Sequence, residues 1–260
     1  MVLEHSSHST SSLSSLTCQE VVDEDTFINL TNYNISSNTE EEHQYVQMLL
    51  EREISADYKS SYMIGDWIKC ARLDAITWIL KTRALFGFRF QTAFLSVNYF
   101  DRFLSKRVIE NEKHWAIRLL SVACLSLAAK MEEECTVPAL SEFPGEDNRF
   151  ESKVIQRMEL LVLNTLEWKM GSVTPYAYVH YFITSITKLC KDRPPRNIVS
   201  RTVELILAIM RDVNFKDYRP SVIAVAAALV ALDQKLTRQT LESKINALSF
   251  NGLLEIVSSL

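Results

Sequence analysis

Glycine is scarce in this 260-residue chain: it has only five, about 2% where ~7% is usual. So few glycines disfavour a turn-rich all-β fold and a chain built on glycine-rich phosphate loops. Long hydrophobic runs are also missing. The longest, at 119–129 and 222–232, are far short of the ~20 residues that a membrane span needs. We therefore expect a protein that does not enter the membrane.

The residue patterns of familiar enzyme and metal sites are absent as well. The five cysteines form no CxxC pair, and the five histidines show no metal-ligand spacing. GxGxxG, GxxxxGK[ST], HExxH and GxSxG do not occur. The acidic run Glu132, Glu133 and Glu134 is typical of a solvated helix end. We expect no catalysis, no cofactor, no metal and a reducing intracellular compartment.

Basic residues are missing from the first 51 positions, which hold nine acidic residues and no Lys or Arg. The other 209 residues hold 28 basic and 23 acidic residues, a net charge of +5. The overall charge of −4 disfavours a general nucleic-acid binder, which would normally be basic. Residues 1–39 are rich in Ser, Thr and Asn, a composition that cannot bury enough apolar area to fold. The sequence therefore predicts a disordered acidic arm over 1–39.

From residue 40 onward, apolar residues recur with the helical period of 3.6. Two segments of small and apolar residues, 119–129 and 222–232, predict buried central helices. Asp66 and Thr174 are predicted helix N-caps, and Gly171 marks a break between two units, 40–170 and 171–260. The pattern predicts an all-α fold of two successive bundles of about five helices, at about 41–54, 66–86, 90–104, 112–132, 150–166, 175–190, 196–212, 220–233, 238–248 and 251–258.

Four segments resemble the cyclin box in order and spacing, apart from about three extra residues near 106–113. They read ARLDAITW, NYFDRFL, LAAKMEE and MELLVL, and they begin at residues 71, 98, 127 and 158. The arm also contains LTCQE at 16–20, which matches LxCxE, a motif that docks in the pocket of retinoblastoma-type proteins. Together these features resemble a D-type cyclin, and the sequence of the matching segments is most similar to the plant forms. The resemblance implies two tandem cyclin folds.

The resemblance also assigns residues to a kinase-binding face. Lys130 and Glu159 match the two charged residues by which cyclins grip the kinase; ordinary surface charge at helix ends is the alternative. Leu163 and Trp168 fall where the family places apolar contacts to the kinase. Leu163 suits core packing equally well.

Other matched residues have structural or altered roles. Arg72 and Asp101 match an internal ion pair that orients two helices, and Leu119 matches a core leucine. Many cyclins also recruit substrates through an apolar groove that accepts Arg-x-Leu motifs. Only Trp78 keeps the family's residue type there, and Lys81 replaces an acid, so we expect a degraded groove. The matching positions are Ala71, Asp74, Ala75, Trp78, Lys81 and Arg118.

The resemblance implies a regulatory subunit that binds and activates a cyclin-dependent kinase. Leu16, Cys18 and Glu20 would direct the complex to a retinoblastoma-related protein and promote entry from G1 into S phase. The resemblance also implies kinase inhibitors as partners, and it implies neither nucleic acid nor membrane. The implied location is the nucleus, and also the cytoplasm. One alternative is a cyclin-fold transcription scaffold, which the missing zinc ribbon disfavours. Another is an α-helical enzyme, which no feature favours.

Overall fold

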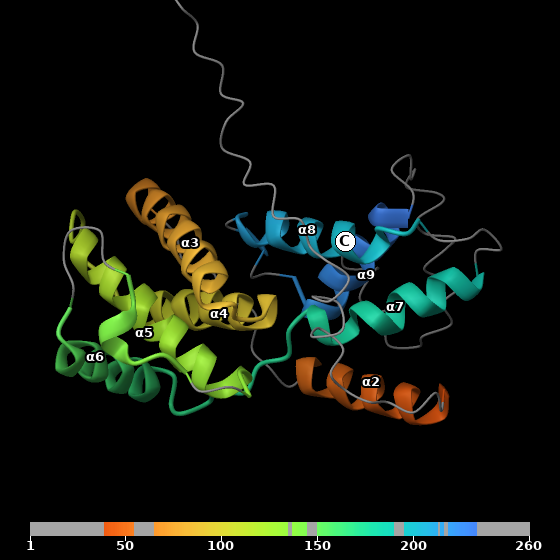
Figure 1. Ribbon diagram of the computed structural model, residues 1–260, viewed down its shortest axis with the longest axis horizontal. Helices are drawn as coiled ribbons and strands as arrows, with labels where there is room; N and C mark the ends of the chain where they lie inside the picture. Colours follow the sequence, from red (N-terminus) through yellow and green to blue (C-terminus); the bar gives the residue numbers. More distant parts are fainter. Residues whose placement is uncertain are drawn as a thin grey trace, which may run out of the picture.

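The computed structural model describes residues 39–54, 65–134, 137–144, 150–189, 195–212, 214–215 and 218–232. Within these residues every regular element is a helix, so the predicted all-α fold is confirmed. Figure 1 shows α3 to α6 gathered in one bundle and α7 to α9 in a second. The elements are α2 (Thr39–Ile54), α3 (Asp66–Phe86), α4 (Phe90–Lys106), α5 (His114–Glu132), the short 3₁₀ helix η1 (Leu140–Glu142), α6 (Ser152–Thr165), α7 (Tyr176–Leu189), α8 (Ile198–Met210) and α9 (Pro220–Leu232).

Each bundle is built around its most apolar helix. Every residue of α5 from Leu119 to Ala129 is buried, and α5 packs against α3, α4 and α6. In the second bundle, α9 is buried on nearly all sides and packs against α7 and α8. Small side chains such as Ala and Ser let neighbouring helices approach these two closely. The predicted central helices are therefore confirmed, whereas the predicted helices at 238–248 and 251–258 lie outside the described residues.

Helix α2 packs against the second bundle although it precedes the first one in the chain. Its buried residues Val46, Leu49 and Leu50 share one apolar cluster with Tyr178 and Phe182 of α7. Figure 1 shows α2 lying beside α7. The predicted unit 40–170 includes this segment. The structure shows that its apolar face serves the C-terminal bundle.

The two predicted helix caps are wrong. Gly65 holds the N-cap position of α3, and Asp66 forms an ion pair with Lys69 at 3.0 Å. The Thr174 hydroxyl is buried without a partner; its backbone carbonyl accepts a hydrogen bond from the Ala177 N–H at 3.1 Å. A cap depends on local backbone geometry, which a favourable residue type alone does not determine.

The acidic run at the end of α5 has a structural role that the sequence did not indicate. Glu133 accepts hydrogen bonds from the Arg89 N–H, at 2.9 Å, and from the Thr92 hydroxyl. Arg89 occupies the N-cap of α4, so this carboxylate satisfies orphan donors and complements the positive end of the helix dipole. Only Glu134, with a side chain 76% exposed, fits the expected solvated helix end. Among the described helices, none is both long enough and apolar enough to cross a membrane.

Candidate protein-binding site

Lys130 and Glu159 form a direct ion pair between α5 and α6. The Lys130 Nζ lies 2.6 Å from the Glu159 Oε1. The Glu159 side chain is only 9% exposed, whereas that of Lys130 is 44% exposed. Lys130 stands in the last turn of α5, where the helix dipole favours a cation. The pair therefore combines an anchored carboxylate with an ammonium that remains accessible to a partner.

Exposed apolar side chains accompany this ion pair. Met131 follows Lys130 directly, Leu160 follows Glu159 directly, and both are more than half exposed. Leu163 lies one helical turn after Glu159, is half-buried and packs against the core of the first bundle. An exposed apolar surface with a few placed charges is typical of a protein–protein contact.

Trp168 is presented by a constrained turn just after α6. Glu167 and Trp168 have φ values of +55° and +60°, in the left-handed region. Lys106 and Lys169 contact the Glu167 carboxylate at 2.7 and 2.8 Å, and these hydrogen bonds hold its pKa at about 2. Arg102 donates to the Lys169 carbonyl at 2.8 Å. The indole Nε1 donates to the Asn164 Oδ1 at 3.2 Å, so the Trp168 side chain is oriented although it is 62% exposed.

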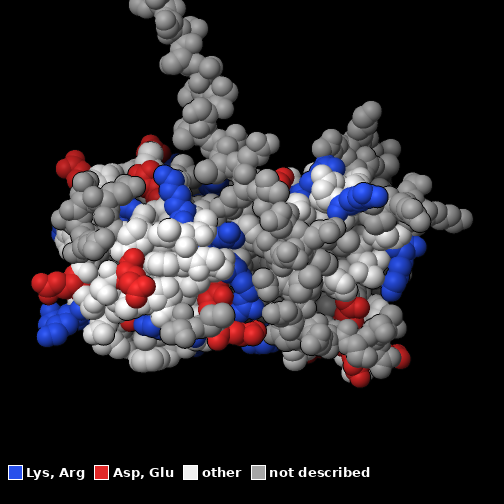
Figure 2. Space-filling model, in the orientation of Figure 1, with Lys and Arg blue, Asp and Glu red and all other residues white. Residues whose placement is uncertain are grey.

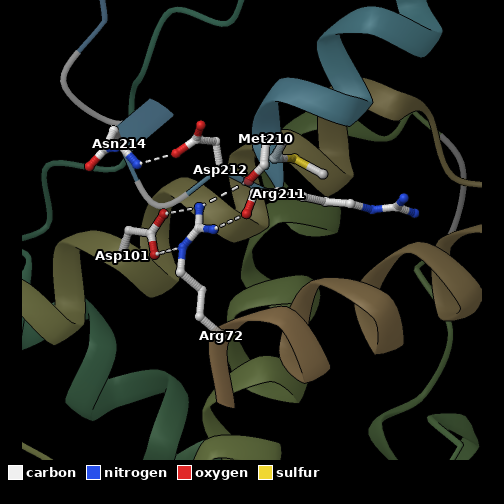
Figure 3. Close-up of polar contacts among 6 residues, drawn as sticks. All are labelled: Arg72, Asp101, Met210, Arg211, Asp212 and Asn214. Atoms are coloured by element: carbon white, nitrogen blue, oxygen red, sulfur yellow. Dashed lines mark hydrogen bonds and ion pairs between the residues drawn. The ribbon is translucent and has the colours of Figure 1, made fainter. Parts of the chain in front are cut away.

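Arg72 contacts two helices besides its own. Its guanidinium donates to both carboxylate oxygens of Asp101 on α4, at 2.8 and 3.0 Å. It also donates to the carbonyls of Met210 and Arg211 at the end of α8, at 3.0 and 3.3 Å (Figure 3). The Phe215 ring lies 5.0 Å from the same guanidinium. The pair therefore joins α3 to α4 and also joins the first bundle to the second.

The six residues matched with the substrate groove lie on α3 and α5. Ala71 and Ala75 are buried, while Asp74 and Lys81 are exposed. The Trp78 ring is only 6% exposed. The sixth residue, Arg118, places its guanidinium 5.6 Å from the centre of that ring. At these positions the surface carries charged side chains beside a covered indole.

Of the remaining predicted residues, one lies in the core and three fall outside the described residues. Leu119 lies in the core of the first bundle with 4% exposure. Leu16, Cys18 and Glu20 fall outside the described residues. Within the described part of the chain, no group of three or more His, Cys, Asp or Glu side chains is arranged to hold a metal.

Sequence reasoning missed a cavity of about 200 Å³ where α2, α4, the end of α5 and α7 meet. Its lining comes from these four helices and from the segment that joins α6 to α7. The spacing of residues along the chain does not predict which of these segments lie next to one another in the fold. The exposure of Met131 and Leu160 was missed as well, although their places next to Lys130 and Glu159 were a signal for it.

Known proteins show clear similarities to this chain. Residues 44–171 match the family "Cyclin, N-terminal domain". Cyclin-D5-1 of Arabidopsis thaliana is 43% identical over 187 residues, which are 69% of this chain and 58% of that protein. Cyclin-D4-1 of the same plant is 37% identical over 229 residues, 83% of this chain and 74% of that protein. The chain spans about half the length of several curated relatives, for example 48% of Cyclin-D4-1 of Oryza sativa subsp. japonica.

Solved structures show the same fold at low sequence identity. A viral cyclin from herpesvirus saimiri superposes with a TM-score of 0.63 and 15% identity, over 80% of this chain and 90% of that one. A chain of the CAK complex from Chaetomium thermophilum bound to ATP-γ-S superposes with a TM-score of 0.54 and 14% identity, over 84% and 68%. At these identities the comparison establishes the arrangement of helices.

Proposed function

Because the chain belongs to the cyclin family and is similar to plant D-type cyclins, we propose that it binds and activates a cyclin-dependent kinase. The observation that carries this proposal is the Lys130–Glu159 pair with its exposed apolar neighbours. A half-exposed ammonium and a buried carboxylate give directional hydrogen bonds to a partner. Met131, Leu160 and Trp168 offer the apolar anchors that contribute most of the affinity in protein interfaces.

Activation follows if this face binds one kinase conformation better than the other. A protein kinase is active only when a Lys–Glu ion pair is assembled in its catalytic site. A partner that prefers this arrangement shifts the kinase population towards it by its difference in affinity. The regulatory subunit then needs no catalytic residue of its own.

The experiment replaces both charges, as Lys130→Ala with Glu159→Ala, and measures kinase binding and phosphorylation of a peptide substrate. Removing both leaves no buried unpaired carboxylate, so the variant should fold. We expect binding to weaken at least tenfold (~1.4 kcal/mol or more) because two hot-spot contacts are lost. The matched control is Asp66→Ala with Lys69→Ala, an exposed pair on α3 at 3.0 Å. Full activation by the first variant would refute the proposed face.

We propose further that Leu16, Cys18 and Glu20 recruit a retinoblastoma-related protein in the nucleus, so that its phosphorylation promotes entry into S phase. The support is the LxCxE pattern in an acidic segment. An extended peptide of this kind binds by adding backbone hydrogen bonds and filling alternate side-chain pockets. Replacing all three residues with Ala should abolish binding of that protein and leave phosphorylation of a short peptide unchanged. Unchanged binding would mean that the motif is incidental.

The surface charge supports a protein-binding role over a transcription scaffold on DNA. Figure 2 shows acidic and basic side chains intermixed on the visible face of the first bundle, around a broad uncharged area. Duplex DNA is bound through basic residues clustered on one face. In the described part of the chain, this face offers no such single-sign stripe.

A further inference from the structure

The cavity between the two bundles has a mixed lining. Met131 and Met170 contribute apolar surface, and Glu132, Gln91 and Thr174 contribute polar groups. Its volume of about 200 Å³ is several times the ≈ 30 Å³ that one water molecule takes up in the liquid. A small planar or tetrahedral polar group therefore fits inside.

Glu132 is the unmatched charge of this cavity. It makes no hydrogen bond or ion pair with any described residue, in contrast to the neighbouring Glu133. Burial raises its pKa, and the charge of Glu133 raises it further; only Arg89 acts in the opposite direction. Arg89 itself is engaged with Glu133, at 3.6 Å. Arg52 also lines the cavity, has a partner of its own, and is not among the groups that shift this pKa.

Thr174 supplies a second unmatched polar group. The residue is only 3% exposed, and its hydroxyl has no hydrogen-bond partner. A buried hydroxyl without a partner is costly, and native structures nearly always provide one. Thr174 lines the cavity as a residue, and its unused hydroxyl lies within the wall, so Glu132 is the accessible acceptor.

We propose that this cavity binds a guanidinium or primary ammonium group. The Glu132 carboxylate accepts charge-assisted hydrogen bonds from its N–H donors. The methionine side chains cover the apolar part of the bound group. The group comes either from an Arg or Lys side chain of a partner protein or from a free small amine, and both present the same chemistry.

The test uses the purified full chain with its methionine methyl groups labelled with ¹³C for NMR. Methylguanidinium chloride is titrated against tetramethylammonium chloride at equal ionic strength, because tetramethylammonium is a cation without N–H donors. We expect the signals of Met131 and Met170 to shift saturably with methylguanidinium only. Met210, which is buried at the end of α8 and does not line the cavity, serves as the internal reference.

Two variants separate the site from general electrostatics. Glu132→Gln keeps the shape of the side chain and removes its charge, so methylguanidinium should bind at least tenfold more weakly. Glu134→Gln removes a neighbouring charge that does not line the cavity and should leave the affinity unchanged. Equal shifts with tetramethylammonium, or equal affinity in the Glu132 variant, would overturn the proposal.

A second measurement, of kinase binding by the two variants, identifies the source of the cation. If a partner side chain occupies the cavity, Glu132→Gln weakens kinase binding and methylguanidinium competes with the kinase. If the ligand is a free amine, kinase binding is equal in both variants while the NMR result stands. Because the titration uses the chain alone, its outcome does not depend on whether the proposed kinase interface is correct.

Discussion

Trp168 has an exposed aromatic side chain on a left-handed backbone. Its φ is +60° and its exposure is 62%. A residue with a Cβ in this conformation costs about 1–2 kcal/mol, so the surrounding contacts must enforce it. The hydrogen bonds to Glu167 and to the carbonyl of Lys169 do so. Strain that is held in place at an exposed side chain is a sign of function.

Two substitutions separate the backbone of Trp168 from its side chain. Trp168→Gly should be more stable than Trp168→Ala by about 1 kcal/mol, because only glycine adopts positive φ without a penalty. Both variants should bind the kinase at least tenfold more weakly, because both lack the indole. Urea unfolding and calorimetric titration measure the two effects.

The control is the same pair of substitutions at Leu160 inside α6. There the order should reverse, with Gly less stable than Ala by about 1 kcal/mol, because the helix interior disfavours glycine. An alanine variant as stable as the glycine variant at Trp168 would show that its backbone stores no strain.

At the residue scale, the resemblance to the cyclin box singled out the candidate residues and left their geometry open. Lys130 and Glu159 were chosen because they stand in the LAAKMEE and MELLVL segments that carry this resemblance. Their mutual contact at 2.6 Å depends on how α5 packs against α6. The cavity at Glu132 was beyond prediction, since its lining comes from several separate segments.

At the scale of elements, helix positions were predictable and helix caps were not. The described helices begin and end within about two residues of the expected ranges, because apolar periodicity is a local signal. At the starts of two helices the donors are satisfied by distant carboxylates. Glu133 serves α4, and Glu53 of α2 accepts hydrogen bonds from the N–H and hydroxyl of Ser221 at the start of α9, at 2.9 and 2.7 Å. Such partners are known only once the helices have packed.

The Glu53 cap predicts a pH dependence of stability. Burial raises the pKa of this carboxyl above 4.5, against the hydrogen bonds from Ser221 and Tyr178. The folded state therefore binds the proton more tightly than the unfolded state. The contribution of the Glu53 carboxyl to the free energy of unfolding is fully present below pH 4.5. It is lost as pH rises through the pKa of the folded state.

The stability difference between the native chain and Glu53→Gln should therefore change in favour of the variant as pH rises above 4.5. Gln keeps an acceptor oxygen for Ser221 and does not titrate. Urea unfolding at several pH values up to 8 measures this difference. A difference that is constant across the range, or one that favours the native chain more at high pH, would contradict the assignment.

At the scale of the whole molecule, Arg72 links the two bundles. Its side chain is 2% exposed, and its donors reach Asp101 on α4 and two carbonyls at the end of α8 (Figure 3). The C-terminal end of a helix carries a partial negative charge, so a cation is favourable there. The bundles therefore share one buried hydrogen-bond network, and their relative placement depends on it.

Loss of the Arg72 guanidinium should accordingly cost more than loss of the Asp101 charge. Arg72→Met leaves a carboxylate and two carbonyls without their donor, and should destabilise the chain by about 3–5 kcal/mol. Asp101→Asn should cost less, because the guanidinium keeps both carbonyls of α8 as acceptors. Lys69→Met, on the same helix with a side chain 47% exposed, is the control and should cost under about 0.5 kcal/mol. Equal losses for the Arg72 and Asp101 variants in urea unfolding would mean that the network holds only α3 and α4, and that the bundles are joined by apolar packing alone.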